Sequence, residues 1–529
     1  MNDLAAGGAS AALQNTPVVE TMSGRIRGAV IEDVAAFKCI PYGAPTSGAA
    51  RFMPPRRPAS WAGVRDALEY SGHAPQAGLR ATPRPELANF SGAPDTSPET
   101  EDCLTLNVWS PGPQQGAKRP VMVWFHGGAF AYGTANAPRL QGSRLAKRGD
   151  VVVVTVNQRL NIFGFLDLSA IGGAEFAPSG NAGTLDMVAA LEWVRDNIDG
   201  FGGDPGNVTI FGESGGGGKV CTLLAMPSAR GLFHRAIVQS GAAVRLRERD
   251  RAARLTEAVL TVVGLSAAQL DRLQALPVAQ LLAAVAPATK AIGPAAMPLF
   301  DRYPFGPVVD GEIVPRHPFD PDAPDISADI PLLIGDMKDE MTSFLATDDK
   351  VWNRTLTEQE LRDRVAVVAG SHADQVIETY RRLHPGANPA ERLIATLTDS
   401  NFRIRSLVVV GRKTMQNRAP AYMYAFNWET PLFDGRLKSP HALDVPFTFD
   451  TLDFTNATDR SPAAHKLAAT MSGAWTAFAR DGRPAHPAMP AWPAYNQTER
   501  ATMVLDTECR IANDPGGDTR LLWQAITGT

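Results

Sequence analysis

Short apolar runs recur along the chain, and between them apolar residues return at helical spacing. The runs are rich in β-branched residues, which is typical of strands buried on both faces of a sheet. Leu185, Val188 and Leu191 begin a helical pattern that we expect to extend over residues 185–198. Strands alternating with helices predict an α/β fold whose central, mostly parallel sheet is flanked by helices. The predicted strands cover residues 121–125, 151–156, 208–211, 236–238, 331–334 and 421–428.

Two helix starts carry the capping-box pattern, in which a Ser or Thr is followed three residues later by Glu or Gln. They are Ser266 with Gln269 and Thr357 with Glu360. The Pro/Gly-rich stretches 80–98 and 484–493 are typical of long loops and not of linkers between domains. The small residues at the start of the chain predict a flexible N-terminus over residues 1–16.

Composition narrows the classes of function. Of the 529 residues, 44% are hydrophobic and 20% charged, and the formal net charge is −4. No block of like charges is present, so neither nucleic acid nor an anionic membrane surface is an expected partner. No apolar run reaches the roughly 18 residues of a membrane span, and the first residues lack the regions of a signal peptide. The four cysteines match neither a zinc site nor a CxxC pair, so we expect a reducing, cytoplasmic location.

Residues 212–216, Gly-Glu-Ser-Gly-Gly, form a G-x-S-x-G pentapeptide. A Gly-rich turn with an incidental serine is one interpretation. The flanks favour a nucleophile elbow, because the predicted strand 208–211 precedes the turn and a helix over 217–224 can follow it. Glycine lets the backbone turn tightly, so that Ser214 Oγ projects from the end of the sheet as a nucleophile.

The elbow continues into four consecutive glycines, residues 215–218. Each costs about 1 kcal/mol relative to Ala inside a helix, and close backbone approach accounts for two of them. Lys219 follows directly. It could contact an anionic substrate, but an ion pair with an acid such as Glu213 is the expected arrangement.

A second Gly-rich turn, His126-Gly127-Gly128-Ala129-Phe130, follows the strand 121–125. Backbone N–H groups at such a turn can bind a developing oxyanion. We expect Gly128 and Ala129 to donate, joined by Gly215 of the elbow. His126 precedes the nucleophile and is interpreted as structural.

The base is sought after Ser214, because an α/β-hydrolase triad runs Ser, acid, His along the chain. His441 alone among the later histidines lies in a loop shortly after a strong strand, 421–428, and is the expected base. An unperturbed histidine titrates near ~6.5, so activity should fall on the acid side, around or below neutrality.

The candidate acids follow the strand 331–334. They are Asp336, Asp339 and Glu340, and spacing alone does not separate Glu340 from Asp339. Glu340 is preferred. Asp336 and Asp339 are expected to be solvated or to cap a helix.

Together these motifs resemble the type-B carboxylesterase family, which includes the cholinesterases and bacterial para-nitrobenzyl esterases. The resemblance implies an α/β-hydrolase fold with large helical and loop insertions around the active site, and Glu340 as the acid. Two departures are Gln158, where Tyr is usual, and Gly215, where Ala is usual. The similarity extends from Phe37 to about Tyr495, and its strongest segments are 40–43, 101–108, 157–166, 180–183, 201–205, 212–216, 335–340 and 441–444.

The resemblance implies hydrolysis of a small-molecule carboxylic ester through an acyl-enzyme. His441 accepts the proton of Ser214 Oγ while Glu340 orients the imidazole, and neither a metal nor a cofactor is needed. Because these groups span residues 214 to 441, residues 17–529 are predicted to form one catalytic domain. The sequence leaves the oligomeric state open.

The resemblance also places Tyr303 and Phe305, within the segment 301–305, at an acyl pocket with Phe344 nearby. Ordinary loop packing is an equally open interpretation of these residues. Two other functions remain in view. One is a non-catalytic binding or adhesion protein on the same fold, which would lack triad residues, and the other is an amidase or carbamate hydrolase with the same triad.

The family usually pairs Cys103 with a cysteine about 30 residues earlier, where this chain has Ala-Pro-Gln at positions 74–76. We therefore expect Cys103 to be a free, largely buried thiol. The loop 74–98, without its cross-link, is expected to be more mobile than its cross-linked counterparts.

Overall fold

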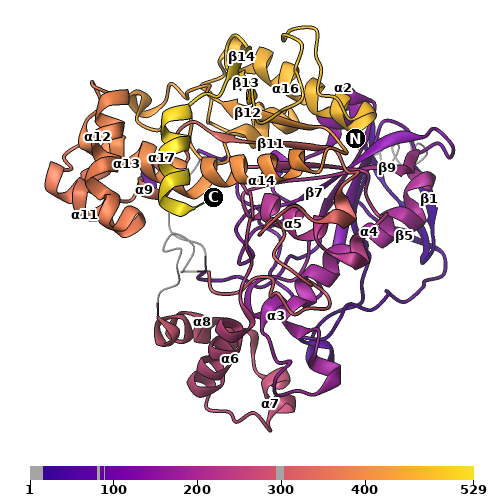
Figure 1. Ribbon diagram of the computed structural model, residues 1–529. Coiled ribbons are helices and arrows are strands. Elements are labelled where there is room, and N and C mark those ends of the chain that lie inside the picture. Colours follow the sequence, from indigo (N-terminus) through magenta and orange to yellow (C-terminus); the bar gives the residue numbers. More distant parts are fainter. Residues whose placement is uncertain (1–15, 80–83, 88–89, 294–302, 529) are drawn as a thin grey trace, which may run out of the picture.

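The computed structural model describes residues 16–79, 84–87, 90–293 and 303–528. Within these residues an 11-stranded sheet has the order β14-β13-β12-β11-β10-β9-β7-β8-β6-β4-β3 (Figure 1). The seven strands from β13 to β8 run parallel, and the outer pairs are antiparallel. The strands are β3 (Ala29–Ile31), β4 (Val34–Pro41), β6 (Thr105–Ser110), β7 (Arg119–Phe125), β8 (Val152–Val156), β9 (Gly203–Glu213), β10 (Arg235–Gln239), β11 (Leu332–Met337), β12 (Ala421–Phe426), β13 (Ala501–Leu505) and β14 (Arg510–Asn513).

All six predicted strands lie in the parallel part of this sheet, and the predicted α/β class is confirmed. A second, three-stranded sheet near the N-terminus was not foreseen. It consists of β1 (Val18–Thr21), β2 (Gly24–Arg27) and β5 (Val64–Asp66). The predicted segment 1–16 lies outside the described residues except for Thr16.

Helices cover both faces of the large sheet, and alternate residues of β7 show how. Val121 and Val123 pack into one core with α4 (Ala182–Asn197), α5 (Gly215–Leu224) and α14 (Ile404–Met415). Met122 and Trp124 face a second core, built with α2 (Ser143–Gly149), α15 (Asp444–Phe449) and α16 (Pro462–Asp481). Burial on both faces explains why these strands read as continuous apolar runs.

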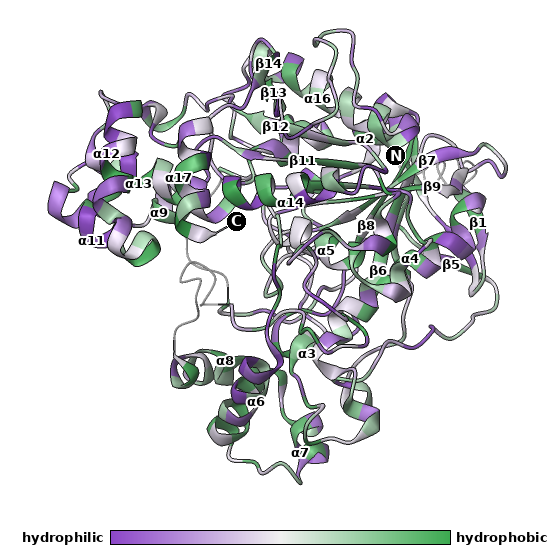
Figure 2. Cartoon of the chain, viewed as in Figure 1, coloured by the Kyte–Doolittle hydropathy of each residue, from purple (hydrophilic) through white to green (hydrophobic). Residues whose placement is uncertain are grey.

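Two helical insertions follow β10 and β11, as the resemblance implied. The first packs around its own apolar cluster and comprises α6 (Arg249–Val263), α7 (Leu270–Ala275) and α8 (Val278–Ile292). The second comprises α9 (Met341–Leu345), α10 (Asp349–Trp352), α11 (Glu358–Ala369), α12 (Ala373–Leu383) and α13 (Pro389–Thr398), and it packs beside α17 (Gly517–Thr527). The outer faces of α11 and α12 are hydrophilic, whereas the central strands are hydrophobic (Figure 2).

One of the two capping boxes is confirmed. Thr357 caps α11, and the side chain of Glu360 returns to the Thr357 backbone. The other is wrong, because α7 begins only at Leu270 and the Ser266 hydroxyl and backbone N–H bond to the Gln269 side chain ahead of that helix. Among the described residues, no helix is long and apolar enough to span a membrane.

Candidate active site

Ser214 stands at a sharp turn between β9 and α5, as the elbow motif predicted. Its backbone is strained, with φ 57° and ψ −121°, and its N–H donates to Gln239 O of the neighbouring strand at 2.8 Å. Such strain exposes a nucleophile at the carboxyl end of a parallel sheet. The helix begins at Gly215, two residues earlier than expected.

Three of the four glycines in the run are required by close packing. A Cβ on Gly215 would lie 2.0 Å from Ala129 O, and one on Gly216 would lie 2.0 Å from Phe125 O. A Cβ on Gly217 would lie 2.8 Å from Gly241 Cα. Gly218 is different, since its Cβ would meet the Phe130 ring at an ordinary 3.5 Å. The elbow therefore needs three glycines, one more than the sequence explained.

We expect Gly218→Ala to raise the free energy of unfolding by about 0.5–1 kcal/mol, because Ala loses less backbone entropy in a helix and the site has room for its methyl group. Gly216→Ala is the matched control and should lower it, since its methyl group would clash with the Phe125 carbonyl. Urea unfolding of both variants checks this. Destabilisation by Gly218→Ala would contradict the space seen beside Phe130.

The loop after β7 lies directly against the elbow. Gly128 and Ala129 both have positive φ, 94° and 55°, and Gly128 O accepts from the N–H groups of Ala131 and Tyr132 at 3.1 Å each. A Cβ on Gly127 would lie 3.5 Å from Ser214 Cβ. The structure thus brings the three predicted oxyanion donors, Gly128, Ala129 and Gly215, to one place beside the serine.

The predicted acid and base are also brought together. His441 Nδ1 lies 2.5 Å from Glu340 Oε2, and the other Glu340 oxygen accepts from Met337 N at 2.9 Å. The second ring nitrogen, His441 Nε2, lies 3.1 Å from Glu213 Oε1. No hydrogen bond joins His441 to Ser214 Oγ in these described residues. Catalytic hydrogen bonds commonly tighten only when substrate is bound.

Comparisons with known proteins place the chain in a family. A model of the carboxylesterase family matches residues 15–519. The chain belongs to the carboxylesterase family. It is 37% identical to a para-nitrobenzyl esterase of Bacillus subtilis over 95% of this chain and 97% of that one. It is 32% identical to a phenmedipham hydrolase of Pseudarthrobacter oxydans, over 94% and 97% of the two chains.

The chain is also similar in structure to solved carboxylesterases. A carboxylesterase of Geobacillus stearothermophilus superposes with a TM-score of 0.82 at 38% identity, covering 96% of this chain and all of that chain. The predicted α/β-hydrolase fold and the family resemblance are confirmed. The chain is a carboxylic ester hydrolase, which sets aside a non-catalytic role on the same fold.

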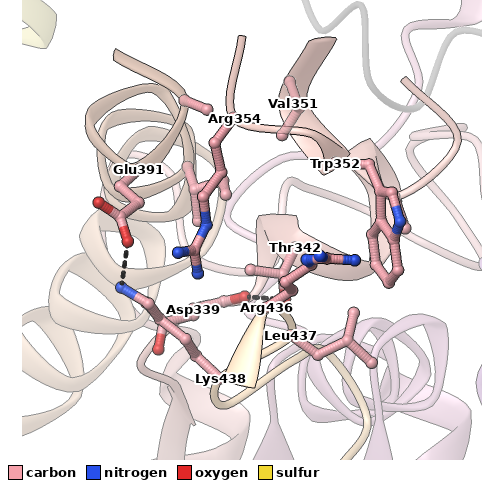
Figure 3. Close-up of a pocket in the computed structure, with 12 residues that line it drawn as sticks. Asp339, Thr342, Val351, Trp352, Arg354, Glu391, Arg436, Leu437 and Lys438 are labelled. Atoms are coloured by element: carbon pink, nitrogen blue, oxygen red, sulfur yellow. Dashed lines mark hydrogen bonds and ion pairs between the residues drawn. The ribbon is translucent and has the colours of Figure 1, made fainter. Parts of the chain in front are cut away.

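Asp339 of this carboxylesterase is separated from the imidazole. It lines a cavity of about 30 Å³ together with Arg354, Arg436 and Lys438 (Figure 3). Its carboxylate accepts from the Ser439 backbone N–H at 3.4 Å, and among the described residues no hydrogen bond or ion pair joins Asp339 to His441. Glu340, one residue on, faces the ring instead.

The expectation that Asp336 and Asp339 are solvated or cap a helix is wrong. Asp336 is 1% exposed and lies 3.2 Å from Arg403, and Asp339 is 8% exposed. Burial raises the pKa of Asp336 to about 7, against the opposing charge of Arg403. The parallel sheet and the second helical insertion enclose this strand end, so both carboxylates are buried.

Buried acids control the charge of His441. Burial by itself lowers the His441 pKa, but the charges of Glu213, Glu340 and Asp444 outweigh it and raise the pKa to about 9. Burial raises the pKa of Glu213 to about 8, although the positive charge of protonated His441 acts to lower it. Asp444 is held by hydrogen bonds from Gln239 and Tyr424 at 2.8 and 2.9 Å. Sequence reasoning gave neither acid a role at the imidazole, because it expected Glu213 to pair with Lys219 and did not single out the Asp444 carboxylate.

We expect kcat/KM to fall as pH drops through a midpoint above 6.5, higher than an unperturbed histidine predicts. A protonated His441 cannot accept a proton, and its pKa is raised. Glu213→Gln removes one of the raising charges and should move the midpoint down by about one pH unit. Profiles of kcat/KM from about pH 5 to 10 measure the shift of the midpoint. The matched control is Glu429→Gln, since Glu429 is an exposed carboxylate that forms a salt bridge with Lys338.

An unmoved midpoint in Glu213→Gln would show that Glu213 does not set the charge of His441. A midpoint below about 6 in the unmodified enzyme would contradict the raised pKa itself.

The expected ion pair between Lys219 and Glu213 is wrong. Lys219 is 0% exposed, and its Nζ donates to His126 O at 2.8 Å. No carboxylate within the described ranges lies within salt-bridge distance of it. His126 is buried without reaching Ser214 or His441, consistent with its interpretation as structural.

The predicted pocket residues fall in different surroundings. The Phe344 ring lies 4.9 Å from the His441 ring and 5.9 Å from Phe402, which the sequence did not single out. The Tyr303 ring lies 5.4 Å from Tyr132, just past the glycine loop. Phe305 is 2% exposed and packs into the cluster of the first insertion. Asp301 and Arg302 lie outside the described residues.

All four cysteines are described, and all are free. Cys103 is 0% exposed, as expected, and burial raises its thiol pKa. At the position of the missing partner, Gln76 bonds in both directions with the Gly133 backbone, at 2.7 and 3.0 Å. The greater mobility of loop 74–98 stays a prediction. Among the described residues, no group of three His, Cys, Asp or Glu could hold a metal ion.

Proposed function

We propose that the enzyme cleaves carboxylic esters through a Ser214–Glu340–His441 triad and an acyl-enzyme intermediate. The supporting observation is the 2.5 Å contact between His441 Nδ1 and the fully buried Glu340, beside a serine on a strained elbow. A carboxylate in that position fixes the tautomer of the imidazole and stabilises its charged form. Residues 17–529 act as one catalytic domain, because β9, the loop after β11 and the loop after β12 supply the three groups.

In the first half-reaction, Ser214 Oγ attacks the ester carbonyl carbon and its proton passes to His441 Nε2. Gly128, Ala129 and Gly215 donate their N–H groups to the oxyanion that forms. The imidazolium then gives its proton to the leaving alcohol oxygen, and the acyl group remains on Ser214. For this step Nε2 exchanges its contact with Glu213 for one with Ser214 Oγ.

In the second half-reaction a water molecule repeats the sequence. His441 accepts a proton from the water, which attacks the acyl carbon. The imidazolium then protonates Ser214 Oγ, and the carboxylic acid leaves. No group changes its oxidation state in either half-reaction, and the His441 imidazole suffices for the proton transfers.

The acyl pocket is proposed to include Phe344, which contacts the His441 ring, together with Tyr303 and Phe305. The free cysteines and the absence of a membrane-spanning helix among the described residues support a cytoplasmic location as a proposal. Para-nitrobenzyl esters are the first substrates to test, because a para-nitrobenzyl esterase is 37% identical to this chain.

The decisive experiment is a panel of para-nitrobenzyl and para-nitrophenyl esters that vary in acyl size, each paired with the matching amide and carbamate. We expect kcat/KM for the esters to exceed that for the amides at every acyl size. Faster turnover of the amides or carbamates would overturn the ester assignment while leaving the triad in place. Phe344→Ala should change the ranking of acyl sizes, and an unchanged ranking would remove Phe344 from the pocket.

A further inference from the structure

A lysine is buried behind the glycine loop of this enzyme without an acidic partner. Lys219 lies on α5, one and a half turns beyond the elbow serine, and is 0% exposed. Its pKa is lowered well below the usual value by burial. A buried ammonium is costly, so its retention needs a reason beyond filling space.

The contacts of Lys219 converge on both ends of that loop. Nζ donates to the carbonyl of His126, the first residue of the loop, at 2.8 Å. It also lies 5.9 Å from the ring of Phe130, the last residue. The residues between them, Gly127 to Ala129, include two of the proposed oxyanion donors. The lysine thus contacts the two residues that bound the loop.

Gln158 completes the arrangement. A lysine can only donate, so the amide oxygen of Gln158 faces it. In that orientation the oxygen lies 2.9 Å from both Lys219 Nζ and His126 Nε2, and the amide nitrogen donates to Val156 O at 3.3 Å. Gln158 follows β8, so the network ties the loop to the sheet. This is the position where the family usually has Tyr.

The loop needs such a support because its geometry is unusual and crowded. Ala129 holds a positive φ of 55°, which an L-residue rarely adopts. A Cβ on Gly215 would lie only 2.0 Å from Ala129 O, so the loop and the elbow are in direct contact. A loop that relaxed from this conformation would carry its N–H groups away from the serine.

We propose that Lys219 is a positioning residue for the oxyanion hole, which it keeps in place by binding the His126 carbonyl and the Gln158 amide. This inference rests on the proposed function, since it assigns the glycine loop to the oxyanion. Lys219 touches neither substrate nor Ser214 Oγ, and it acts through the loop. The interaction matters most when negative charge develops on the substrate oxygen, so it affects kcat more than KM.

The test compares Lys219→Met with a matched buried lysine elsewhere. Lys413 on α14 is 3% exposed, and its Nζ donates to two backbone carbonyls, Ser327 O and Ala328 O, at 2.7 and 2.8 Å. Lys413→Met therefore removes the same kind of group, with the same kind of partners, outside the site. Both variants are measured for Tm, kcat, KM and inhibition by a trifluoromethyl ketone, which forms a tetrahedral oxyanion on the serine.

We expect Lys219→Met to lower kcat by about 10²-fold or more, the scale of losing an oxyanion donor, with KM changed less than about threefold. Trifluoromethyl ketone affinity should fall in parallel with kcat/KM. Lys219→Gln, whose shorter side chain keeps an N–H donor, should recover part of the loss. Lys413→Met should lower Tm while leaving kcat and inhibitor affinity within about twofold.

If Lys219→Met lowers Tm but keeps the kcat and inhibitor affinity of the unmodified enzyme, the lysine is structural only and the proposal is overturned. If Lys219→Met does not fold, Lys219→Leu, which also lacks a donor, decides, and an unchanged kcat for it overturns the proposal. The unmodified enzyme and Ser214→Ala are assayed alongside. An enzyme that hydrolyses esters equally well without Ser214 would refute the proposed function, and that result is distinct from a failure at Lys219.

Discussion

Ser214→Ala is expected to lower kcat for ester hydrolysis by about 10⁶-fold, the scale measured when a triad serine is removed. Ser214 stands on a strained turn beside the glycine loop, and no other hydroxyl is proposed as a nucleophile. Alanine keeps the Cβ and therefore the backbone turn, so the unfolding transition should be little changed. Steady-state kinetics measure the loss, and a serine-directed phosphonate should label Ser214 in the unmodified enzyme, as peptide mapping would show.

Ser240 provides a matched control for this substitution. It follows β10, the next parallel strand, is 2% exposed and also has a positive φ, 49°. Ser240→Ala should keep kcat within about twofold, because its hydroxyl is not proposed to react. Near-normal turnover by Ser214→Ala, or a phosphonate on any other residue, would remove Ser214 as the nucleophile.

Glu340→Gln is expected to lower kcat by about 10⁴-fold, as when the acid of a triad is made neutral. The substitution removes the charge 2.5 Å from His441 Nδ1 and places an amide where the imidazole needs an acceptor. The same change removes one of the groups that raise the His441 pKa, so the acid limb of kcat/KM should also move to lower pH. Both effects follow from one contact and can be measured on the same preparations.

Asp339→Asn separates this effect from a general loss of charge. Asp339 is the neighbouring carboxylate, but it lines the cavity beside Lys438 (Figure 3). Among the described residues, no hydrogen bond or ion pair joins Asp339 to His441. We expect its kcat to stay within roughly fivefold of the unmodified enzyme. A 10⁴-fold loss in Asp339→Asn, with Glu340→Gln nearly active, would reverse the assignment of the acid.

The parallel core of the sheet was predictable from the sequence because its information is local. A run such as Val152–Val156 is buried on both faces. A continuous β-branched segment is typical of such a strand and of few other elements. The elbow was predictable for the same reason, since strand, turn and helix follow each other within a dozen residues. The chain order expected of a triad then made His441 the candidate base.

The strand β6 was not predicted, because its polar residues interrupt the continuous apolar run that marks a buried strand. Thr105 and Asn107 are buried, and the Asn107 amide donates to Asn136 Oδ1 and Thr155 Oγ1 at 3.2 and 3.1 Å. These partners come from other segments and pair with the amide only after folding. A buried polar side chain is acceptable when it is hydrogen-bonded, and a sequence does not show whether it is.

The sequence by itself predicted the family and the class of fold, which are confirmed, and it singled out Ser214 and His441 as the candidate nucleophile and base. It narrowed the acid to Asp339 or Glu340, and only the resemblance chose between them. The tertiary structure decided which groups face the imidazole of His441. Glu213 contacts its Nε2 and Glu340 its Nδ1, although they precede His441 in the sequence by 228 and 101 residues. It also turned Lys219 away from Glu213 and onto the His126 carbonyl. Charge interactions depend on distance through space and on burial, and neither quantity exists until the strands and loops are packed.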